Sequence, residues 1–234
     1  MKIMKFLSLV TMVLLVVSCN KNGVSNKPLK TELDSVSYAV GMDVAKNVKL
    51  SFEDFDNDLF IQGFVNGSDS TNLKMDATKA QELVRGYFQK KQQEELAKRQ
   101  EEARKNKEDG DKFLEENKSK DGVKTTESGL QYLVLKEGTG PKPVATDKVK
   151  LHYHGTLIDG TVFDSSVDKG EPIVHGANQF VRGFSEGLLL MPVGSKYRLF
   201  IPSELGYGAN PRPGGAIKAN SALIFDVELL EIVE

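Results

Sequence analysis

Two short runs joined by an Asp-Gly pair constrain the fold of this chain more than any other feature. In residues 149–157, apolar side chains alternate with polar ones, so one face of a strand would be buried and the other wet. A second short run, residues 161–166, follows Asp159-Gly160. Because Asp-Gly between two such runs is the strongest short-range signal for a β-hairpin, we expect an antiparallel hairpin here.

This hairpin carries groups suited to a binding groove. Tyr153, Phe163 and Asp164 supply two aromatic rings and one carboxylate. With a two-residue turn, however, Phe163 would lie opposite Thr156 and would face away from Tyr153. Both rings can line one groove only if the loop has an odd number of residues or the strand bulges near Ser165. We therefore predict an irregular hairpin.

Residues 1–18 have the pattern of a signal peptide. Lys2 and Lys5 precede an apolar run of about twelve residues, which is too short to span a bilayer as a helix. Its end, Val16-Val17-Ser18-Cys19, resembles a bacterial lipoprotein box, with a small residue directly before the single cysteine. The resemblance implies cleavage before Cys19 and attachment of several acyl chains there, which gives stable membrane anchoring. The alternative is a stray thiol after an ordinary signal peptide.

The residues after the cysteine predict its destination. Asn20 rather than Asp follows the cysteine, which in lipoproteins does not signal retention at the inner membrane. We therefore expect a lipid-anchored protein of the outer membrane that faces the periplasm, with exposure at the cell surface left open. Residues 19–31, rich in Asn, Lys, Gly and Ser, predict a flexible tether.

Composition suits a globular protein of one or two domains, with 39% hydrophobic and 27% charged residues. Removal of Lys2 and Lys5 with the signal peptide leaves 29 basic residues against 33 acidic ones. A chain with this charge balance and no basic patch lacks the positive surface that binds nucleic-acid phosphates, so we expect no nucleic-acid partner.

Residues 32–88 predict a domain of three helices. The first covers residues 34–49 and has Asp34 as a candidate cap, the second covers about 54–66, and the third begins after a cap at Asp76. Apolar side chains recur at three- and four-residue steps, as in the first helix at Leu33, Val36, Val40, Val44 and Val48. Neither of the first two helices can bury its apolar stripe alone.

Residues 89–124 predict a charged connecting helix and a linker. Glu, Gln, Lys and Arg dominate, and pairs such as Glu101 and Lys105 have the favourable four-residue spacing. A helix that is polar all round usually bridges domains through solvent. If it runs from residue 76 to about 117, its length is on the order of 60 Å at 1.5 Å per residue. Its mixed charges disfavour a basic surface for an acidic partner.

Residues 125–234 change to strand composition, and the apolar run 222–232 is expected at the centre of a sheet. With the hairpin, five further blocks of this part resemble FKBP-type peptidyl-prolyl isomerases in order and spacing. They are Phe180-Val181-Arg182-Gly183-Phe184-Ser185-Glu186-Gly187-Leu188, Met191-Pro192-Val193-Gly194, Ile201-Pro202, Leu205-Gly206-Tyr207-Gly208 and Leu223-Ile224-Phe225-Asp226-Val227-Glu228-Leu229-Leu230.

The helical part resembles the dimerisation domain of FKBPs of the macrophage infectivity potentiator type. The motifs are Ser37-Tyr38-Ala39-Val40-Gly41-Met42-Asp43 and Gln62-Gly63-Phe64. The resemblance implies an α+β protein: an N-terminal α-helical dimerisation domain, a long connecting helix, and a C-terminal FKBP domain. In that domain a twisted antiparallel sheet wraps around a short helix, here starting near Arg182. It also implies a homodimer.

The resemblance assigns an aromatic groove that binds the proline ring. Its catalytic residues would be Tyr153, Phe163, Asp164, Phe184, Tyr207 and Phe225, and its substrate-binding residues Ile173, Phe180, Val181 and Ile217. Phe184 would form the floor, and Asp164 would orient Tyr153. The Tyr207 hydroxyl and the Ile217 backbone N–H would donate hydrogen bonds to the substrate.

Three departures from the family pattern predict an altered substrate preference and weaker binding of macrolide ligands. Phe184 replaces a floor residue that is commonly Trp. Ile217-Lys218-Ala219 replaces Ile-Pro-Pro, which makes that loop less rigid. Lys169 replaces, as a single point charge, the Arg that pairs with the groove aspartate.

Other site chemistries have little support in the sequence. His152 and His154, two apart on one strand face, could chelate a metal, but no carboxylate or cysteine pattern accompanies them. We therefore predict two surface histidines, no metal site and no cofactor. Ser165 and Ser166 lack a base in the sequence pattern, so nucleophilic catalysis is not supported.

The function that follows is prolyl isomerisation of exported proteins during folding, with unfolded or proline-containing polypeptides as substrates. Such isomerisations limit folding at tens to hundreds of seconds. A holdase chaperone with incidental isomerase activity is the alternative. An inert structural lipoprotein is a third interpretation, and it would require that the protein bind no proline peptide.

Overall fold

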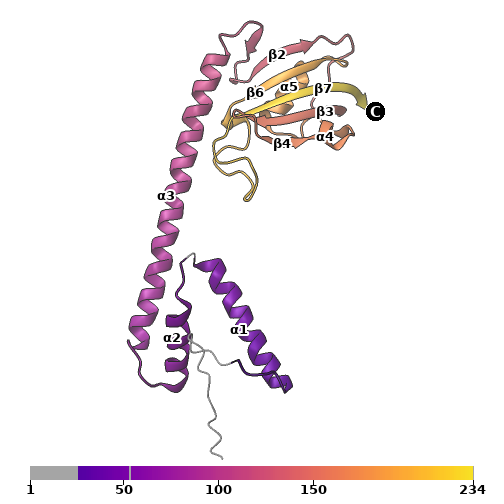
Figure 1. Ribbon diagram of the computed structural model, residues 1–234. Coiled ribbons are helices and arrows are strands. Elements are labelled where there is room, and N and C mark those ends of the chain that lie inside the picture. Colours follow the sequence, from indigo (N-terminus) through magenta and orange to yellow (C-terminus); the bar gives the residue numbers. More distant parts are fainter. Residues whose placement is uncertain (1–25, 53, 234) are drawn as a thin grey trace, which may run out of the picture. The chain divides into compact units, whose positions relative to one another are not determined.

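The computed structural model describes residues 26–52 and 54–233 (Figure 1). The predicted signal peptide, Cys19 and the first part of the predicted tether lie outside these residues. The chain divides into two compact units, of which the first ends at Val84 and the second begins at Arg85.

The first unit contains α1 (Glu32–Ser51) and α2 (Asn57–Asp69). The cap of α1 is Thr31 and not Asp34: the Asp34 amide donates to the Thr31 hydroxyl, and the Asp34 carboxylate accepts from the Thr31 amide, which makes a capping box. Asp56 caps α2 by accepting from the amide of Leu59. The second helix extends past the predicted end because its C-cap, Ser70, takes the left-handed conformation there.

Neither α1 nor α2 buries a residue within one chain. The apolar stripes predicted from their spacing are present but exposed, with Leu33 at 73% and Phe64 at 69%. The prediction that neither helix can bury its stripe alone is confirmed.

The long helix α3 (Ala77–Asn117) begins in the first unit and continues into the second. Its predicted cap is confirmed, because the Asp76 carboxylate accepts from the amide of Lys79 at 2.7 Å. Exposed ion pairs lie along the surface of this helix, such as those of Arg104 with Glu101 and Glu108 at 2.6 Å each.

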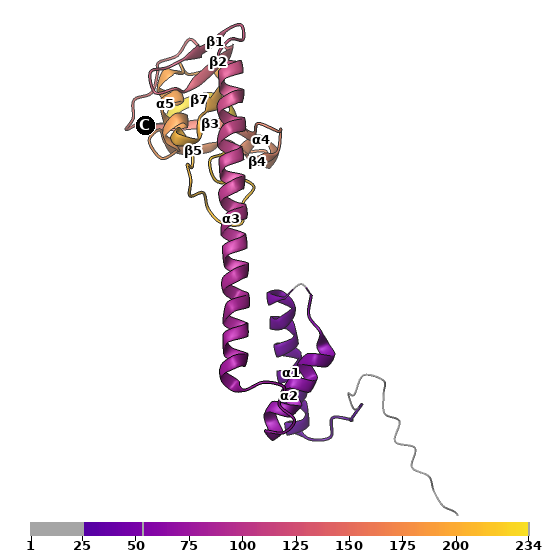
Figure 2. The same cartoon turned by 90° about the vertical axis from the view of Figure 1, so that its left-hand side faces the viewer.

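The last turns of α3 pack on the sheet of the second unit (Figure 2). Gly110, Leu114 and Asn117 are buried. The Asn117 amide donates to the Gln131 side chain at 2.9 Å, and the Gln131 amide donates to the carbonyl of Leu114 at 2.8 Å. The expectation of a helix that is polar and solvated all round is therefore wrong for this end.

The second unit is built on one antiparallel sheet with the strand order β1-β2-β6-β7-β3-β4, and β5 pairs with β3. The strands are β1 (Val123–Thr125), β2 (Gln131–Lys136), β3 (Lys148–Leu157), β4 (Val162–Ser165), β5 (Ile173–Gly176), β6 (Lys196–Ile201) and β7 (Leu223–Val233). The apolar C-terminal strand β7 lies between β6 and β3, as predicted.

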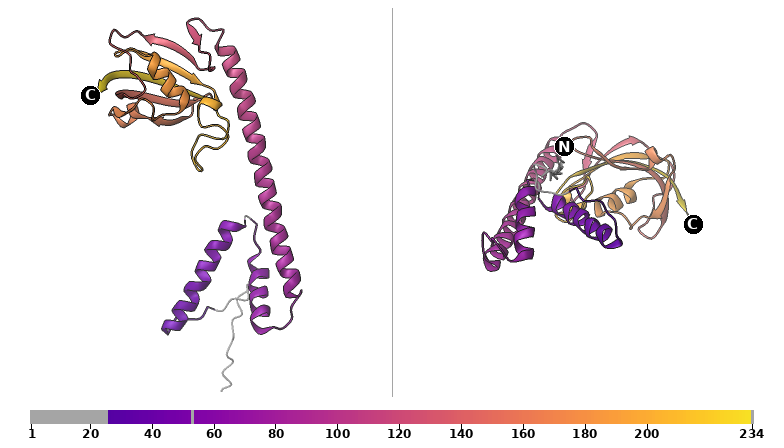
Figure 3. Two further views of the ribbon diagram at one scale, coloured as in Figure 1. Left: turned by 180° about the vertical axis from the view of Figure 1, so that it is seen from behind. Right: turned by 60° about the horizontal axis from the view of Figure 1, so that its bottom comes forward.

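Helix α5 (Arg182–Leu190) lies inside the curve of this sheet (Figure 3). Its close approach depends on glycine: a Cβ on Gly187 would come within 2.5 Å of the Leu199 side chain. Phe184 and Leu188 of α5 enter the core together with buried side chains of β3, β6 and β7. The α+β fold predicted from the sequence is confirmed. Two short elements complete it, α4 (Ser166–Lys169) and the 3-10 turn η1 (Ser203–Leu205).

Candidate active site

A cavity of about 560 Å³ opens between the sheet, α5 and the loop that precedes β7. Nine of the ten groove residues expected from the resemblance line it, and Ile173 does not. The lining consists of Tyr153, Phe163, Asp164, Gln179, Phe180, Val181, Phe184, Tyr207, Arg212, Ile217 and Phe225. Ile173 lies on β5 opposite Leu151 and packs against the core.

The irregular hairpin predicted from the sequence is present, and it aims Phe163 into the cavity. Gly155 pairs with Asp164, but Thr156 pairs with Val162, so Phe163 is an extra residue in β4. The turn closes with the amide of Leu157 donating to the carbonyl of Thr161, which leaves three residues in the loop. Both the odd loop and the bulge therefore occur, and the bulge lies two residues before Ser165.

Gly155 makes room for the ring that the bulge turns inward. A Cβ at this position would lie 2.6 Å from the Phe163 ring and 2.8 Å from the Phe225 ring. Any larger residue would displace one of these two rings. The sequence motif Tyr153-His154-Gly155 thus has a packing requirement at its third position.

The floor of the cavity is a cluster of interlocked aromatic rings. Phe184 is 2% exposed and meets Phe225 edge to face, with ring centroids 4.9 Å apart. Tyr153 and Phe163 also meet this pair at nearly perpendicular or tilted angles, and Phe180 stacks on Phe184 at 4.5 Å. Offset and edge-to-face pairs are the favoured arrangements of aromatic rings, so the floor is rigid before any ligand arrives.

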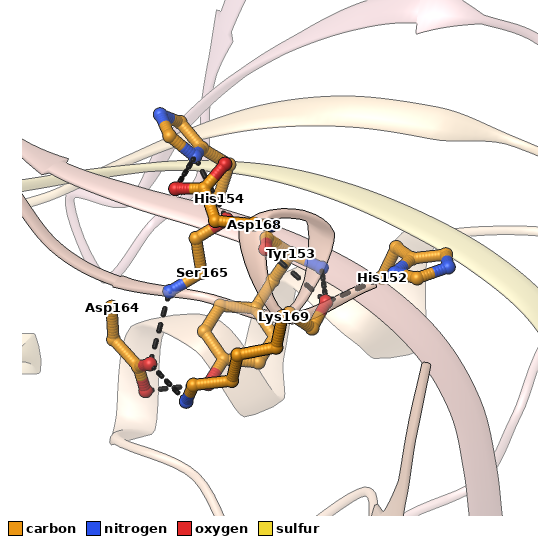
Figure 4. A network of polar contacts seen from close by, with 8 residues as sticks. His152, Tyr153, His154, Asp164, Ser165, Asp168 and Lys169 are labelled. Carbon is orange, nitrogen blue, oxygen red and sulfur yellow. Dashed lines mark hydrogen bonds and ion pairs between the residues drawn. The ribbon is translucent and has the colours of Figure 1, made fainter. Parts of the chain in front are cut away.

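Asp164 joins three donors at the edge of the cavity (Figure 4). The Tyr153 hydroxyl donates to one carboxylate oxygen at 2.5 Å, while Lys169 at 2.6 Å and the amide of Ser165 at 2.9 Å donate to the other. Lys169 thus provides the positive charge that the resemblance assigned to it, through a single ammonium rather than a guanidinium fork.

These contacts fix the charge states of the pair. Burial acts to raise the pKa of Asp164, but the hydrogen bonds from Lys169 and Tyr153 outweigh it and hold that pKa below its ordinary value. Burial, followed by the hydrogen bond to Asp164, raises the pKa of Tyr153. At neutral pH the carboxylate is therefore ionised and the phenol keeps its proton.

The two histidines of β3 each contact a serine. His152 Nδ1 lies 3.1 Å from the Ser166 hydroxyl, and His154 Nδ1 lies 3.0 Å from the Ser165 hydroxyl. In Figure 4 the two histidine rings stand apart, and Ser165 lies beside His154. Within residues 26–52 and 54–233, no group of three or more His, Cys, Asp or Glu residues could hold a metal ion.

The expectation that both serines lack a base is corrected by these contacts, but the arrangement is not a nucleophilic triad. Asp168 approaches His154 at the same nitrogen, Nδ1, that faces Ser165, at 3.8 Å, whereas a triad uses the two ring nitrogens separately. Ser165 is also occupied as the cap of α4, where it accepts from the amide of Asp168. Both serines are buried, at 4% and 0% exposure, and neither lines the cavity.

The open side of the cavity is bounded by residues 206–222, which we name the rim loop. Tyr207 stands at its start and is 43% exposed. Its hydroxyl has no hydrogen-bond partner among the described residues, and the same holds for the backbone N–H of Ile217 in that part of the chain. Both donors border the cavity and are available to a ligand.

Gln179 and Arg212 line the cavity but were not expected there. Gln179 accepts from the amide of Gly176 and so holds the turn before α5. Arg212 lies between two prolines of the rim loop. No periodic pattern identifies either residue, and only the nearness of Arg212 to Tyr207 in the sequence gave a signal.

Comparisons with known proteins agree with this geometry. Residues 33–134 match the family model described as the domain amino-terminal to FKBP-type peptidyl-prolyl isomerase, and residues 140–230 match the model of FKBP-type peptidyl-prolyl cis-trans isomerase.

Among its relatives, the FKBP-type peptidyl-prolyl cis-trans isomerase FkpA of Aeromonas hydrophila is 45% identical over 202 residues, covering 83% of this chain and 74% of the relative. The outer membrane protein MIP of Legionella longbeachae is 39% identical over 209 residues, covering 87% of each. The crystal structure of FkpA from Escherichia coli superposes with a TM-score of 0.68 at 32% identity, covering 88% of this chain and 98% of that one. The chain therefore belongs to the FKBP-type peptidyl-prolyl cis-trans isomerases.

Proposed function

We propose that the cavity catalyses rotation about X-Pro amide bonds by binding, without covalent or acid–base chemistry. The observation that carries this proposal is an apolar, interlocked aromatic floor with two hydrogen-bond donors on its rim that have no partner among the described residues. The barrier to overcome is about 18–20 kcal/mol, because resonance gives the C–N bond partial double-bond character.

The floor lowers this barrier by favouring the twisted amide over the planar one. A planar amide is the more polar of the two because its resonance separates charge. Transfer from water into a groove lined by Phe163, Phe184 and Phe225 therefore disfavours the planar ground state more than the twisted transition state. The proline ring rests on Phe184.

The rim donors orient the substrate during rotation. The Tyr207 hydroxyl donates to a carbonyl oxygen of the substrate, and the N–H of Ile217 donates to a second one. Asp164 holds Tyr153 through its short hydrogen bond and keeps the wall of the groove in place. None of these steps needs a metal or cofactor.

A refolding reaction limited by proline isomerisation tests the proposal. The full-length chain should accelerate the slow phase, and a Tyr207→Phe variant, which removes one donor and no ring, should accelerate it less. No acceleration by the parent protein would refute the enzymatic function.

The isomerase is favoured over the alternative, a holdase that grips unfolded chains, because the relatives named for an activity are named for isomerisation. A chain changed at both Tyr207 and Asp164 separates the two. If it loses isomerisation and still suppresses client aggregation as the parent does, a holdase function stands independently.

The same comparisons support a homodimer formed through the N-terminal helices. Within the described residues of one chain, α1 and α2 bury no side chain, so their apolar stripes are exposed and a second copy would cover them. The match of residues 33–134 to the amino-terminal family model supports the same assignment.

We also propose that the mature protein is held at the outer membrane by lipid on Cys19 and assists exported proteins in folding. One relative is named an outer membrane protein. Among the described residues no helix is long and apolar enough to cross a bilayer. Metabolic labelling with a fatty acid tests the anchor: the parent should carry the label, and Cys19→Ser should not.

A further inference from the structure

The rim loop has few hydrogen bonds of its own. Among the described residues its internal bonds lie at its base and near Lys218: the amide of Asn220 donates to the carbonyl of Gly208 at 2.8 Å, Lys218 Nζ donates to the carbonyl of Gly215, and the amide of Ser221 donates to the carbonyl of Lys218. Residues 209–214, which include Arg212, form turns and irregular backbone, and no side-chain hydrogen bond of the described residues holds them. The position of the loop therefore depends on what holds its base.

Helix α3 holds that base through two crossed amide hydrogen bonds. The Asn106 side chain donates from the helix to the carbonyl of Ala219 at 3.0 Å, and the Asn220 side chain donates from the loop to the carbonyl of Ala103 at 3.3 Å. Both bonds are partly buried, which strengthens them relative to solvent-exposed ones. Asn220 has φ 60, and Asn adopts this left-handed conformation more readily than most residues.

A third contact ties α3 to the turn just before Tyr207. Lys107 reaches Glu204 of η1 at 3.1 Å. The pKa of Glu204 is lowered, because the hydrogen bonds to its carboxylate, Lys107 included, outweigh the opposing effect of burial. One turn of the helix thus contacts both ends of the segment that carries the rim donors.

Above this base the loop stands away from the helix. A cavity of about 730 Å³ separates them, lined by Leu96, Arg99 and Gln100 of α3 and by residues 209–215 and 217–219 of the loop. Arg212 and Ile217 line both this cavity and the aromatic groove, so the loop is a thin wall between two open spaces. Ile217 packs against the core on the groove side of this wall, and on the side of α3 the loop is held by the hydrogen bonds at its base.

We propose that α3 sets the affinity of the groove for its substrate, with Asn106 and Asn220 as positioning residues that hold the rim loop. The proposal rests on the isomerase function above. Loss of the crossed amides lets the loop move into the space beside α3 and carries Ile217 away from the substrate. The binding-competent arrangement is then a smaller fraction of the population, which raises KM. The aromatic floor stays on the sheet and α5, so kcat is retained.

The decisive variant is Asn106→Asp in the full-length chain. It keeps the size of the side chain, but a carboxylate cannot donate to the Ala219 carbonyl at neutral pH. Because one hydrogen bond contributes about 0.5–1.5 kcal/mol, we expect KM for a proline-containing peptide to rise by about 2- to 12-fold with kcat unchanged. Asn106→Gln, which retains the donor, should give a KM closer to that of the parent.

Gln100→Glu is the matched control. It makes the same amide-to-carboxylate change on the same helix and borders the same cavity, but Gln100 makes no hydrogen bond to the loop among the residues described. Its KM should equal that of the parent. An unchanged KM in Asn106→Asp, an equal rise in Gln100→Glu, or a rise in Asn106→Gln as large as in Asn106→Asp would each overturn the proposal.

Hydrogen exchange separates this proposal from the isomerase function itself. Amides of residues 209–219 should exchange faster in Asn106→Asp than in the parent and Gln100→Glu, while those of β7 should not change. Asn220→Gly keeps a positive φ accessible and removes the side-chain amide, so it should speed exchange in the same residues. This second variant tests the proposal if Asn106→Asp fails to fold. If the parent accelerates no refolding, the proposed function fails, and the exchange result still supports or contradicts the role of the crossed amides.

Discussion

Asp164 and Tyr153 act as one unit at the edge of the groove. The carboxylate accepts from the phenol, from Lys169 and from the amide of Ser165, so its removal frees three donors at once. The pair positions the Tyr153 ring, which contacts the rings of both Phe184 and Phe225. A change at Asp164 is therefore expected to alter how the Tyr153 ring packs against the aromatic floor.

We expect Asp164→Asn to lower kcat/KM by about 3- to 10-fold. This loss is smaller than hydrogen bonds to a charged group usually cause, because both Asp164 and Lys169 are partly exposed.

The same variant tests the effect of Asp164 on stability. The folded pKa of Asp164 lies below its ordinary value of 3.8, so the ionised carboxylate stabilises the fold above that pH. This stabilisation is lost as the pH falls through the folded pKa. The stability difference between parent and variant, measured by urea unfolding, should be constant near neutral pH and shrink below pH 3.8. A difference that grows on acidification would contradict this assignment.

We expect Phe184 to have both a structural and a catalytic role, because it is buried in the core and lines the groove. Phe184→Ala should destabilise the protein by about 3–5 kcal/mol, because it leaves a cavity in the core, and should also remove the surface on which proline rests. Leu188→Ala is the control: Leu188 is fully buried on the same helix but does not line the groove. Its cost should be about 2–5 kcal/mol, with kcat/KM retained at temperatures where it is folded. Equal losses of kcat/KM in both variants would mean that Phe184 acts only through stability.

At the scale of elements, the bulged hairpin decides where the groove forms. Gly155→Ala should force the Phe163 or Phe225 ring aside, since its Cβ would lie 2.6 Å from the first. We expect a cost of about 1–3 kcal/mol from overpacking, and a loss of kcat/KM. In a double-mutant cycle measured by denaturant unfolding, Phe163→Ala should relieve much of this cost. Simple addition of the two single effects would indicate that the rings do not meet at Gly155.

The elements also show where sequence reasoning succeeds and where it stops. The irregular hairpin followed from parity alone, because Tyr153 and Phe163 could share a face only through an odd loop or a bulge. The packing of the end of α3 on the sheet could not be predicted from the sequence, because Gly110 and Asn117 do not stand out from the polar residues around them. Their burial depends on partners such as Gln131 and Ala222, which are distant in sequence. The position of Arg212 in the groove and the crossed amide hydrogen bonds of the rim loop were not predicted from the sequence for the same reason. The predicted N-cap of α1 was wrong by three residues, since Thr31 and Asp34 both suit a cap.

At the scale of the whole molecule, the proposed catalytic groove and the proposed dimer interface belong to different units. Every residue that lines the groove follows Arg85, whereas the exposed stripes of α1 and α2 precede Val84. A change in the stripes should therefore alter assembly without altering the groove. This separation makes the homodimer testable independently of the activity.

We expect Phe64→Glu to convert a dimeric parent into a monomer in sedimentation experiments. Phe64 is 69% exposed within one chain, so a charge there breaks no core of that chain, but it would be buried in an interface between two copies. The thermal midpoint of the first unit should depend on protein concentration in the parent and not in the variant. Lys46→Glu, which changes the charge at an exposed position of α1, should stay dimeric.

For a short proline peptide, kcat/KM should be the same in the parent, Phe64→Glu and Lys46→Glu, because such a substrate needs only the groove of one copy. A monomeric parent, or a Phe64→Glu variant that remains dimeric, would show that these stripes are not covered by a second copy.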